Sequence, residues 1–200
     1  MFKNRKEAGK LLAKRLEGYK DKDPIVFSIT KEGIFVGKEV AEQLDVDFSV
    51  LMVSKLPHPT TPYGWFGAIS ERGDTELLED EPYGSEEVKT DILKKLEKEK
   101  YELRGGPLPD LWGKTVILVD DGINQSLTMK AAIKTCRKMN PEEIIVAVPV
   151  TGSNIKSEMK SVADYVIVLE TPELFYRVKD DYLEFEEISF EDAKEIYNKR

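Results

Sequence analysis

The chain has 200 residues, of which 30 are Lys or Arg, 38 are Asp or Glu and one is His, so its formal net charge is −8. A chain this acidic, with no concentrated basic stripe, is a poor candidate for binding nucleic acid or an anionic membrane surface, because neutralising phosphates needs clustered Lys and Arg. With 40% hydrophobic residues and no apolar run near the roughly 18 residues that cross a bilayer, the composition predicts one folded cytoplasmic domain.

The acidic residues are concentrated in two stretches. Residues 71–88 contain eight acids against Arg72 alone, and residues 180–193 contain seven acids and no base, a balance of −7 in each. The rest of the chain carries 29 basic and 23 acidic side chains, a balance of +6. The acidity therefore belongs to two local patches on a mildly basic body.

The first quarter of the chain predicts a helix followed by a strand–turn–helix–strand unit. Apolar positions recur at helical spacing from residue 2 to about 19, which predicts an amphipathic helix. Runs 24–29 and 48–53 are apolar and rich in β-branched residues, as is typical of buried strands. Between them lie a turn at residues 30–33 and a helical pattern that reaches Leu44. This order is that of a βαβ unit.

The segment from Lys55 to about Gly84 interrupts this pattern with four prolines and four glycines. Connections this long inside an α/β domain usually carry function or form a small lobe. Runs 66–70 and 75–78 predict a hairpin that projects from the sheet as a flexible lobe. A charged helix is expected next, from Ser85 as its N-cap to about Leu103, with a solvated surface.

The alternation of strands and helices then returns. It predicts strands at 115–119, 144–150 and 165–169 and helices at 126–139 and 154–163. The fold class is therefore α/β, with an open, mainly parallel, five-stranded sheet flanked by helices. We expect one domain over residues 1–200, with the lobe inserted at about 55–84 and a C-terminal tail at about 170–200.

Two adjacent carboxylates, Asp120 and Asp121, end the strand at 115–119. Ligands of doubly wound sheets bind outside the carboxyl ends of the strands. Adjacent carboxylates can accept hydrogen bonds from vicinal hydroxyls or hold Mg²⁺, and the following loop amides, the Ser126 and Thr128 hydroxyls and a helix N-terminus can cradle an anion. A solvated turn and a receiver-type phosphorylation pocket are the alternatives at this point.

This layout resembles the ribose-5-phosphate loop of the type I phosphoribosyltransferases, which use phosphoribosyl pyrophosphate (PRPP). The resemblance extends over nearly the whole chain, including residues 2–16, 24–33, 55–68 and 172–185, which look like a bacterial and archaeal subgroup of that family. It implies that Asp120 and Asp121 grip the ribose hydroxyls, act in catalysis and hold Mg²⁺. The residues implied to wrap the 5′-phosphate are Ile123, Asn124, Gln125, Ser126, Leu127 and Thr128.

The resemblance also assigns the remaining parts of the site. Thr30, Lys31, Glu32 and Gly33 correspond to the pyrophosphate loop, Lys55 is a further phosphate contact, and Phe175 and Tyr182 could stack on an acceptor base. The implied activity is Mg²⁺-dependent transfer of a 5-phosphoribosyl group from PRPP to a nucleobase-like acceptor. The alternative is a catalytically inactive module of the same fold that binds ribose phosphates or nucleotides. A homodimer is a possible assembly, and a third reading is a scaffold whose acidic patches dock a basic partner.

Two loops depart from the family pattern. After Ile123 the family has a small residue, then Thr-Gly, a small residue and Thr, whereas this chain has the run 124–128, Asn-Gln-Ser-Leu-Thr. The pyrophosphate loop of the family has a basic residue followed by two glycines, and Glu32 stands at the first of these. We expect the Cβ of Ser126 to narrow the phosphate cradle and Glu32 to repel an anion. These departures favour the binding module.

Overall fold

The computed structural model describes residues 1–58, 61, 64–78 and 86–199. Its main sheet has the strand order β2-β1-β6-β7-β8, and all neighbouring strands are parallel. The strands are β1 (Pro24–Ser28), β2 (Asp47–Val50), β6 (Thr115–Val119), β7 (Glu143–Val150) and β8 (Tyr165–Glu170). The predicted open parallel sheet of five strands is confirmed.

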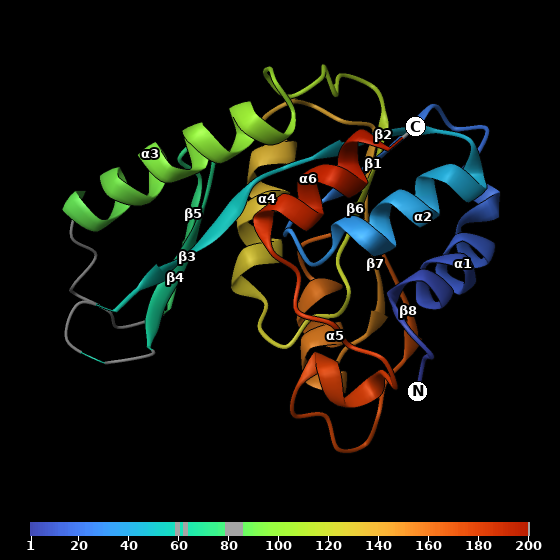
Figure 1. The fold of residues 1–200 in the computed structure, drawn as a ribbon. Helices are drawn as coiled ribbons and strands as arrows, with labels where there is room; N and C mark the ends of the chain where they lie inside the picture. Colours follow the sequence, from blue (N-terminus) through green and yellow to red (C-terminus); the bar gives the residue numbers. More distant parts are fainter. Residues whose placement is uncertain (59–60, 62–63, 79–85, 200) are drawn as a thin grey trace.

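Helices cover both faces of this sheet (Figure 1). Successive side chains of a strand point to opposite faces, so Val26 and Ile117 join one core cluster while Ile25 and Val116 join the other. The first cluster packs on α1 (Arg5–Leu16) and α2 (Ile34–Leu44). The second packs on α4 (Leu127–Arg137), with Met159 at the end of α5 (Ser153–Met159). The strands read as continuous apolar runs because both faces are buried.

The lobe contains a second sheet. Its three antiparallel strands are β3 (Val53–Pro57), β4 (Trp65–Ser70) and β5 (Thr75–Leu77). The prediction of one strand over 48–53 was wrong, because that run is divided between the two sheets. The N–H of Leu51 bonds to Ser28 in the main sheet, whereas the carbonyl of Met52 already accepts a bond from Glu71 of the lobe.

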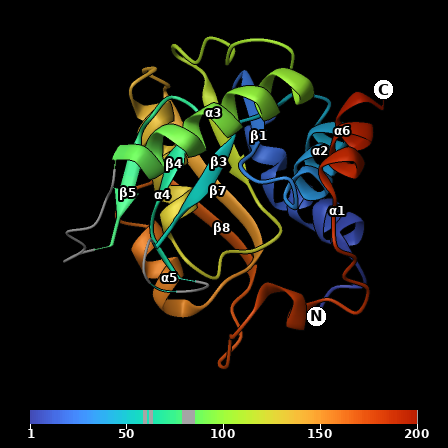
Figure 2. The same cartoon turned by 60° about the vertical axis from the view of Figure 1, so that its left-hand side comes forward.

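The charged helix α3 (Glu86–Leu103) is a structural part of the lobe. Figure 2 shows it lying across β3, β4 and β5. Leu96 and Leu103 are buried in a cluster with Leu56, Phe66 and Ile69. The expectation of a solvated helix was therefore incomplete, because these two leucines pack one side of the helix against the strands of the lobe. The predicted N-cap Ser85 lies outside the described residues.

Acids of the first patch are used inside the molecule. Glu71 pairs with Arg104 at 2.8 Å, and their side chains are 1% and 6% exposed. Asp74 accepts a hydrogen bond from the Thr135 hydroxyl at 2.8 Å and pairs with Lys138 of α4's C-terminal end. Glu71 therefore forms its ion pair within the lobe, and Asp74 connects the lobe to α4, so both of these acids have partners inside the protein.

Replacing Glu71 with Gln is expected to alter the pH dependence of stability. Burial raises the pKa of Glu71, and Arg104 offsets this only in part. A carboxyl group with a higher pKa in the folded state binds more protons there than in the unfolded state, so its contribution to stability falls as the pH rises through that window. From about pH 4 to about pH 7, the free energy of unfolding of the wild type should therefore fall relative to that of Glu71→Gln, measured by urea denaturation.

The exposed Glu17 provides the control for that measurement. Glu17→Gln should follow the pH dependence of the wild type. Two results would contradict the expectation. In one, the free energies of unfolding of the wild type and Glu71→Gln differ by the same amount at every pH. In the other, the wild type becomes more stable relative to Glu71→Gln as the pH rises.

The tail folds back onto the body. It ends in a helix that was not predicted, α6 (Phe190–Asn198), which begins with a capping box between Ser189 and Asp192. Lys38 of α2 donates hydrogen bonds to carbonyls at the end of this helix, including that of Ile196 at 2.5 Å.

In the described part of the chain, no helix is long and apolar enough to cross a membrane.

Candidate functional site

A cleft opens at the carboxyl ends of β1 and β6, where the strand order changes direction. The chain runs from β1 outward to β2 and later crosses to β6 on the other side of β1. Ligands of open α/β sheets bind at such a switch point. The cleft has a volume of about 580 Å³ and is lined by the loops after both strands, by β3 and α3 of the lobe, and by the first residue of α6.

Asp120 connects the two loops of the cleft. Its Oδ1 accepts a hydrogen bond from the Thr30 hydroxyl at 2.6 Å and another from the backbone N–H of Asp121 at 3.0 Å. The Thr30 hydroxyl also accepts a hydrogen bond from the N–H of Gly33 at 3.0 Å. Gly33 lies so close that a Cβ at this position would be 2.7 Å from Asp120 Oδ1. The turn at 30–33 and the acid pair therefore form one unit.

Asp121 is held by residues from both ends of the chain. The Nε of Arg5 donates to Asp121 Oδ2 at 2.8 Å, and the two side chains are 6% and 8% exposed. The hydroxyl of Tyr182 donates to the backbone carbonyl of Asp121 at 2.6 Å. The two neighbouring acids thus have different partners, since one is paired with a cation and the other is held by neutral donors.

Burial raises the pKa of both carboxyl groups. The charge of Asp121 raises the pKa of Asp120 further, although the hydrogen bond from Thr30 opposes this. For Asp121 the Arg5 guanidinium opposes the effect of burial, and the pKa is about 6. Glu32 raises the pKa of both groups. Removing a cation from this site would therefore make ionisation of the pair more costly.

Lys31 and Lys55 line the cleft on the side of these acids. The ammonium of Lys55 lies 3.8 Å from the centre of the Trp65 ring. Burial lowers the pKa of Lys55, while the charges of Asp120 and Glu32 raise it. Lys31 pairs with Glu32 at 3.2 Å and donates a hydrogen bond to the carbonyl of Ile188 in the tail. The cleft therefore offers cations for an anionic group next to carboxylates for hydroxyl groups.

A family model described as the phosphoribosyl transferase domain matches residues 3–183. The chain belongs to this family.

Relatives and solved structures agree with this membership. Two proteins of Mycobacterium tuberculosis, from strains CDC 1551 and H37Rv, are each 33% identical over 198 residues and are named "Putative phosphoribosyl transferase". The match covers 94% of this chain and 44% of each relative, so the chain spans less than half of their length.

Among solved structures, the protein TT1426 from Thermus thermophilus has a TM-score of 0.81 and 30% identity, and the match covers 98% of this chain and 97% of that one. A hypoxanthine-guanine phosphoribosyltransferase from Bacillus anthracis has a TM-score of 0.50 at 15% identity, with coverage of 84% and 79%. The second similarity concerns the fold alone. The membership predicted from the sequence is confirmed.

Most of the predicted phosphoribosyltransferase site residues meet in this one cleft. Those that line it are Thr30, Lys31, Glu32, Lys55, Asp120, Asp121, Ile123, Asn124, Gln125 and Thr128. Gly33 is not among the described residues that line the cleft, but it packs closely against Asp120. Loops that are about 90 residues apart in sequence are thus neighbours, as expected for the carboxyl ends of adjacent parallel strands.

Ser126 and Leu127 are placed differently from the other residues of the phosphate loop. Both are buried, and neither is among the described residues that line the cleft. Burial raises the pKa of Glu158 on α5, but the ammonium of Lys130 and the nearby Ser126 side chain lower it by more. The side chain of Ser126 therefore turns toward α5. Its φ of −74° is ordinary for any residue, so the position does not require glycine here.

Phe175 and Tyr182, which were expected to stack on a base, belong to a hydrophobic cluster with Phe2 and Val150. Tyr182 is 6% exposed, and burial raises the pKa of its hydroxyl. Neither ring is among the described residues that line the cleft. Their stacking on an acceptor stays a prediction.

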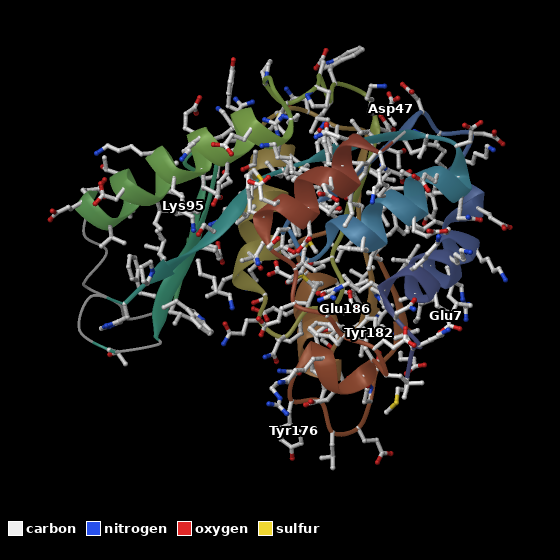
Figure 3. The ribbon with its side chains drawn as sticks, in the orientation of Figure 1. Glu7, Asp47, Lys95, Tyr176, Tyr182 and Glu186 are labelled. Carbon is white, nitrogen blue, oxygen red and sulfur yellow. The ribbon has the colours of Figure 1, made fainter. Side chains whose placement is uncertain are left out.

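Most of the lining residues that sequence reasoning missed come from the lobe and from α6, and the others are Gly122 and, in the tail, Val178. Met52, Leu96 and Phe190 form apolar lining, and Lys95 and Glu99 of α3 add a charged pair at 3.7 Å. Figure 3 shows Lys95 on the side of α3 that faces the strands of the lobe. The sequence carried one usable signal, because the spacing of Ser189 and Asp192 is that of a capping box and marks the start of α6 just before Phe190.

Proposed function

We propose that the cleft binds PRPP and transfers its 5-phosphoribosyl group to a nucleobase-like acceptor. The observation that carries this proposal is the meeting of the acid pair, the turn at 30–32 and Lys55 in one cleft of about 580 Å³. A volume of this size falls in the range of small-molecule sites, roughly 300–1,000 Å³. Membership of the phosphoribosyl transferase domain family supports the choice of ligand.

Each group has a role in this proposal. Asp120 and Asp121 accept hydrogen bonds from the ribose hydroxyls, and the Thr128 hydroxyl with the amides of the 123–126 loop binds the 5′-phosphate. Lys55 and Lys31 bind the pyrophosphate. The bond from ribose C1 to pyrophosphate breaks, a nitrogen of the acceptor attacks C1 from the opposite face, and the proton of that nitrogen passes to water. Catalysis then comes from positioning and from stabilising the charge on the leaving group.

Mg²⁺ fits the donor set as an ion shared with the substrate. In the part of the chain that the structure describes, no group of three His, Cys, Asp or Glu side chains could hold a metal. Mg²⁺ is commonly bound by one or two carboxylates together with substrate phosphates. Asp120 and Asp121 are the carboxylates that would hold it, although Arg5 already occupies Oδ2 of Asp121. When bound, the ion would neutralise the charge of the departing pyrophosphate.

The acceptor would lie between the lobe and α6. Met52, Leu96 and Phe190 offer apolar surface for a flat ring, and Glu99 and Lys95 offer an acceptor and a donor of hydrogen bonds. This combination suits a heterocycle that has both apolar faces and a polar edge.

One observation favours a second function, the binding of ribose phosphates or nucleotides without transfer. Glu32 lines the cleft and pairs with Lys31, and Lys31 also donates to Ile188. Pyrophosphate would have to compete for this lysine and approach a carboxylate. A site that binds one phosphate well and pyrophosphate poorly would bind nucleotides but not release pyrophosphate from PRPP.

Two measurements on the same protein separate these functions. Calorimetry with PRPP and Mg²⁺ reports binding, and a coupled assay with a panel of nucleobases reports pyrophosphate release. Acceptor-dependent release is expected from the transferase. If the protein bound PRPP or a nucleoside monophosphate but released no pyrophosphate with any acceptor, the transferase would be ruled out in favour of the binding module. No binding at about 1 mM ligand, the upper end of ordinary substrate affinities, would contradict both.

A further inference from the structure

The two ends of the chain meet at the acid pair of the cleft. Phe2 and Tyr182 form a parallel bridge, in which the N–H of Phe2 bonds to Asp181 at 2.8 Å and the N–H of Leu183 bonds to Phe2 at 2.9 Å. Figures 1 and 2 both show the N-terminus beside this part of the tail. The bridge brings the first turn of α1 and the segment 182–186 to the same place behind Asp121.

Arg5 is the residue at which these segments converge. Its Nε donates to Asp121 Oδ2 and its Nη1 donates to the carbonyl of Glu186, both at 2.8 Å. Its guanidinium carbon lies 3.8 Å from the centre of the Phe185 ring. Figure 3 shows Tyr182 and Glu186 near one another in this segment. The planar fork of an arginine can make these contacts at once, which the point charge of a lysine cannot.

Fold stability alone does not account for this arginine. Burying an ion pair costs solvation free energy, which the attraction between the charges repays only when the remaining donors are also bonded. Arg5 Nη2 is buried and has no hydrogen-bond partner among the described residues. An apolar residue at this position of α1 would avoid that cost, so the arginine is better explained by what it does to Asp121.

We infer that Arg5 is a positioning residue that holds Asp121 in the orientation needed to bind the ribose hydroxyls. This inference rests on the proposed function. Arg5 fixes the carboxylate through Oδ2, while Asp121 also lines the cleft. It compensates one of two adjacent negative charges, which lowers their mutual repulsion and their repulsion of a phosphorylated ligand. The segment 182–186 completes the support, through the Tyr182 hydroxyl on the Asp121 carbonyl.

The positioning role of Arg5 concerns the ribose part of PRPP and not its pyrophosphate. Lys31 and Lys55, which would bind pyrophosphate, come from the turn after β1 and from β3, and their contacts among the described residues are with groups other than Arg5. Weakening the support of Asp121 should therefore lower affinity for a ligand that contains ribose and leave affinity for pyrophosphate in place. A purely structural role would affect both ligands together.

The test compares Arg5→Lys and Arg5→Met with the wild type by calorimetry, with PRPP and with pyrophosphate, each with Mg²⁺. Arg5→Lys keeps the charge and should fold even if Arg5→Met does not. We expect Arg5→Lys to weaken PRPP binding about tenfold or more, the size of one lost hydrogen bond to a charged group, and to change pyrophosphate binding by less than about twofold. The control is Arg15→Lys, on the exposed side of the same helix, which should change neither.

A second measurement tests the contact itself without any ligand. The Nε–H proton of Arg5 should give a slowly exchanging NMR signal in the wild type, and that signal should be lost in Asp121→Asn. A fast-exchanging signal in the wild type, or equal losses of PRPP and pyrophosphate binding in Arg5→Lys, would overturn the positioning role and leave the proposed function intact. Failure of the wild type to bind PRPP would overturn the proposed function and this role with it.

Discussion

Asp120→Asn is expected to lower the rate of PRPP-dependent pyrophosphate release about a hundredfold, the size of two weakened hydrogen bonds between ribose hydroxyls and a charged acceptor. The variant keeps an oxygen that can accept from Thr30, so the connection between the loops should survive. Burial raises the pKa of Asp120, which means that its ionised form costs stability in the folded state. The free energy of unfolding at neutral pH should therefore be unchanged or higher, as measured by urea denaturation beside the assay.

Asp21→Asn is the matched control, because Asp21 lies exposed before β1. It should leave both the rate and the free energy of unfolding unchanged. If Asp120→Asn were as active as the wild type, the charge of Asp120 would have no role in binding the ligand. A large loss of stability in Asp120→Asn would show that the charge itself holds the loops together.

Gly33→Ala is expected to damage the site through crowding alone. The φ of Gly33 is −68°, which alanine adopts without strain. Its new Cβ, however, would lie 2.7 Å from Asp120 Oδ1, 3.0 Å from Asp120 Cα and 3.2 Å from the Val119 carbonyl oxygen. Two of these atoms belong to the backbone and cannot swing away. We expect a loss of about 1–3 kcal/mol in the free energy of unfolding and a fall in PRPP affinity of more than about tenfold, since Asp120 must move.

Gly18→Ala separates crowding from the general effect of removing a glycine. A Cβ at Gly18 meets no atom within 4 Å. This variant should be as stable as the wild type or about 0.5 kcal/mol more stable, because alanine restricts the unfolded chain. Equal behaviour of the two variants would mean that the turn at 30–33 yields easily and that the closeness of Gly33 to Asp120 has no role in the site.

The acids at the end of β6 were predictable because their signal is local. A continuous apolar run that ends in Asp120 and Asp121 marks a buried strand with polar groups at its carboxyl end, and parallel strands bring such ends to one edge. The same reasoning placed Thr30 and Lys31 after β1. The same reasoning wrongly predicted one strand over the run 48–53. Apolar character indicates that residues are buried, but it does not indicate in which of two sheets they pair.

Other parts of the site had no local signal. Arg5 has the same residue type as the exposed Arg15 of its helix, and only the packing of α1 against the tail turns it inward. Ser126 looked like an obstruction in the phosphate loop, yet it is buried outside the cleft lining and lies beside Glu158, a residue of another helix. In both cases the direction of a side chain depends on partners far away in the sequence.

The sequence by itself determined the α/β class, the acid pair at the end of the third strand of the main sheet and the family to which the chain belongs. These features depend on the period of apolar residues and on short motifs, which each segment carries on its own. Only the tertiary structure decided that α1 and the tail support Asp121 and that α3 and Phe190 line the cleft. Such contacts join residues more than a hundred positions apart or from different layers, and their geometry is set by packing of the whole chain rather than by any one segment.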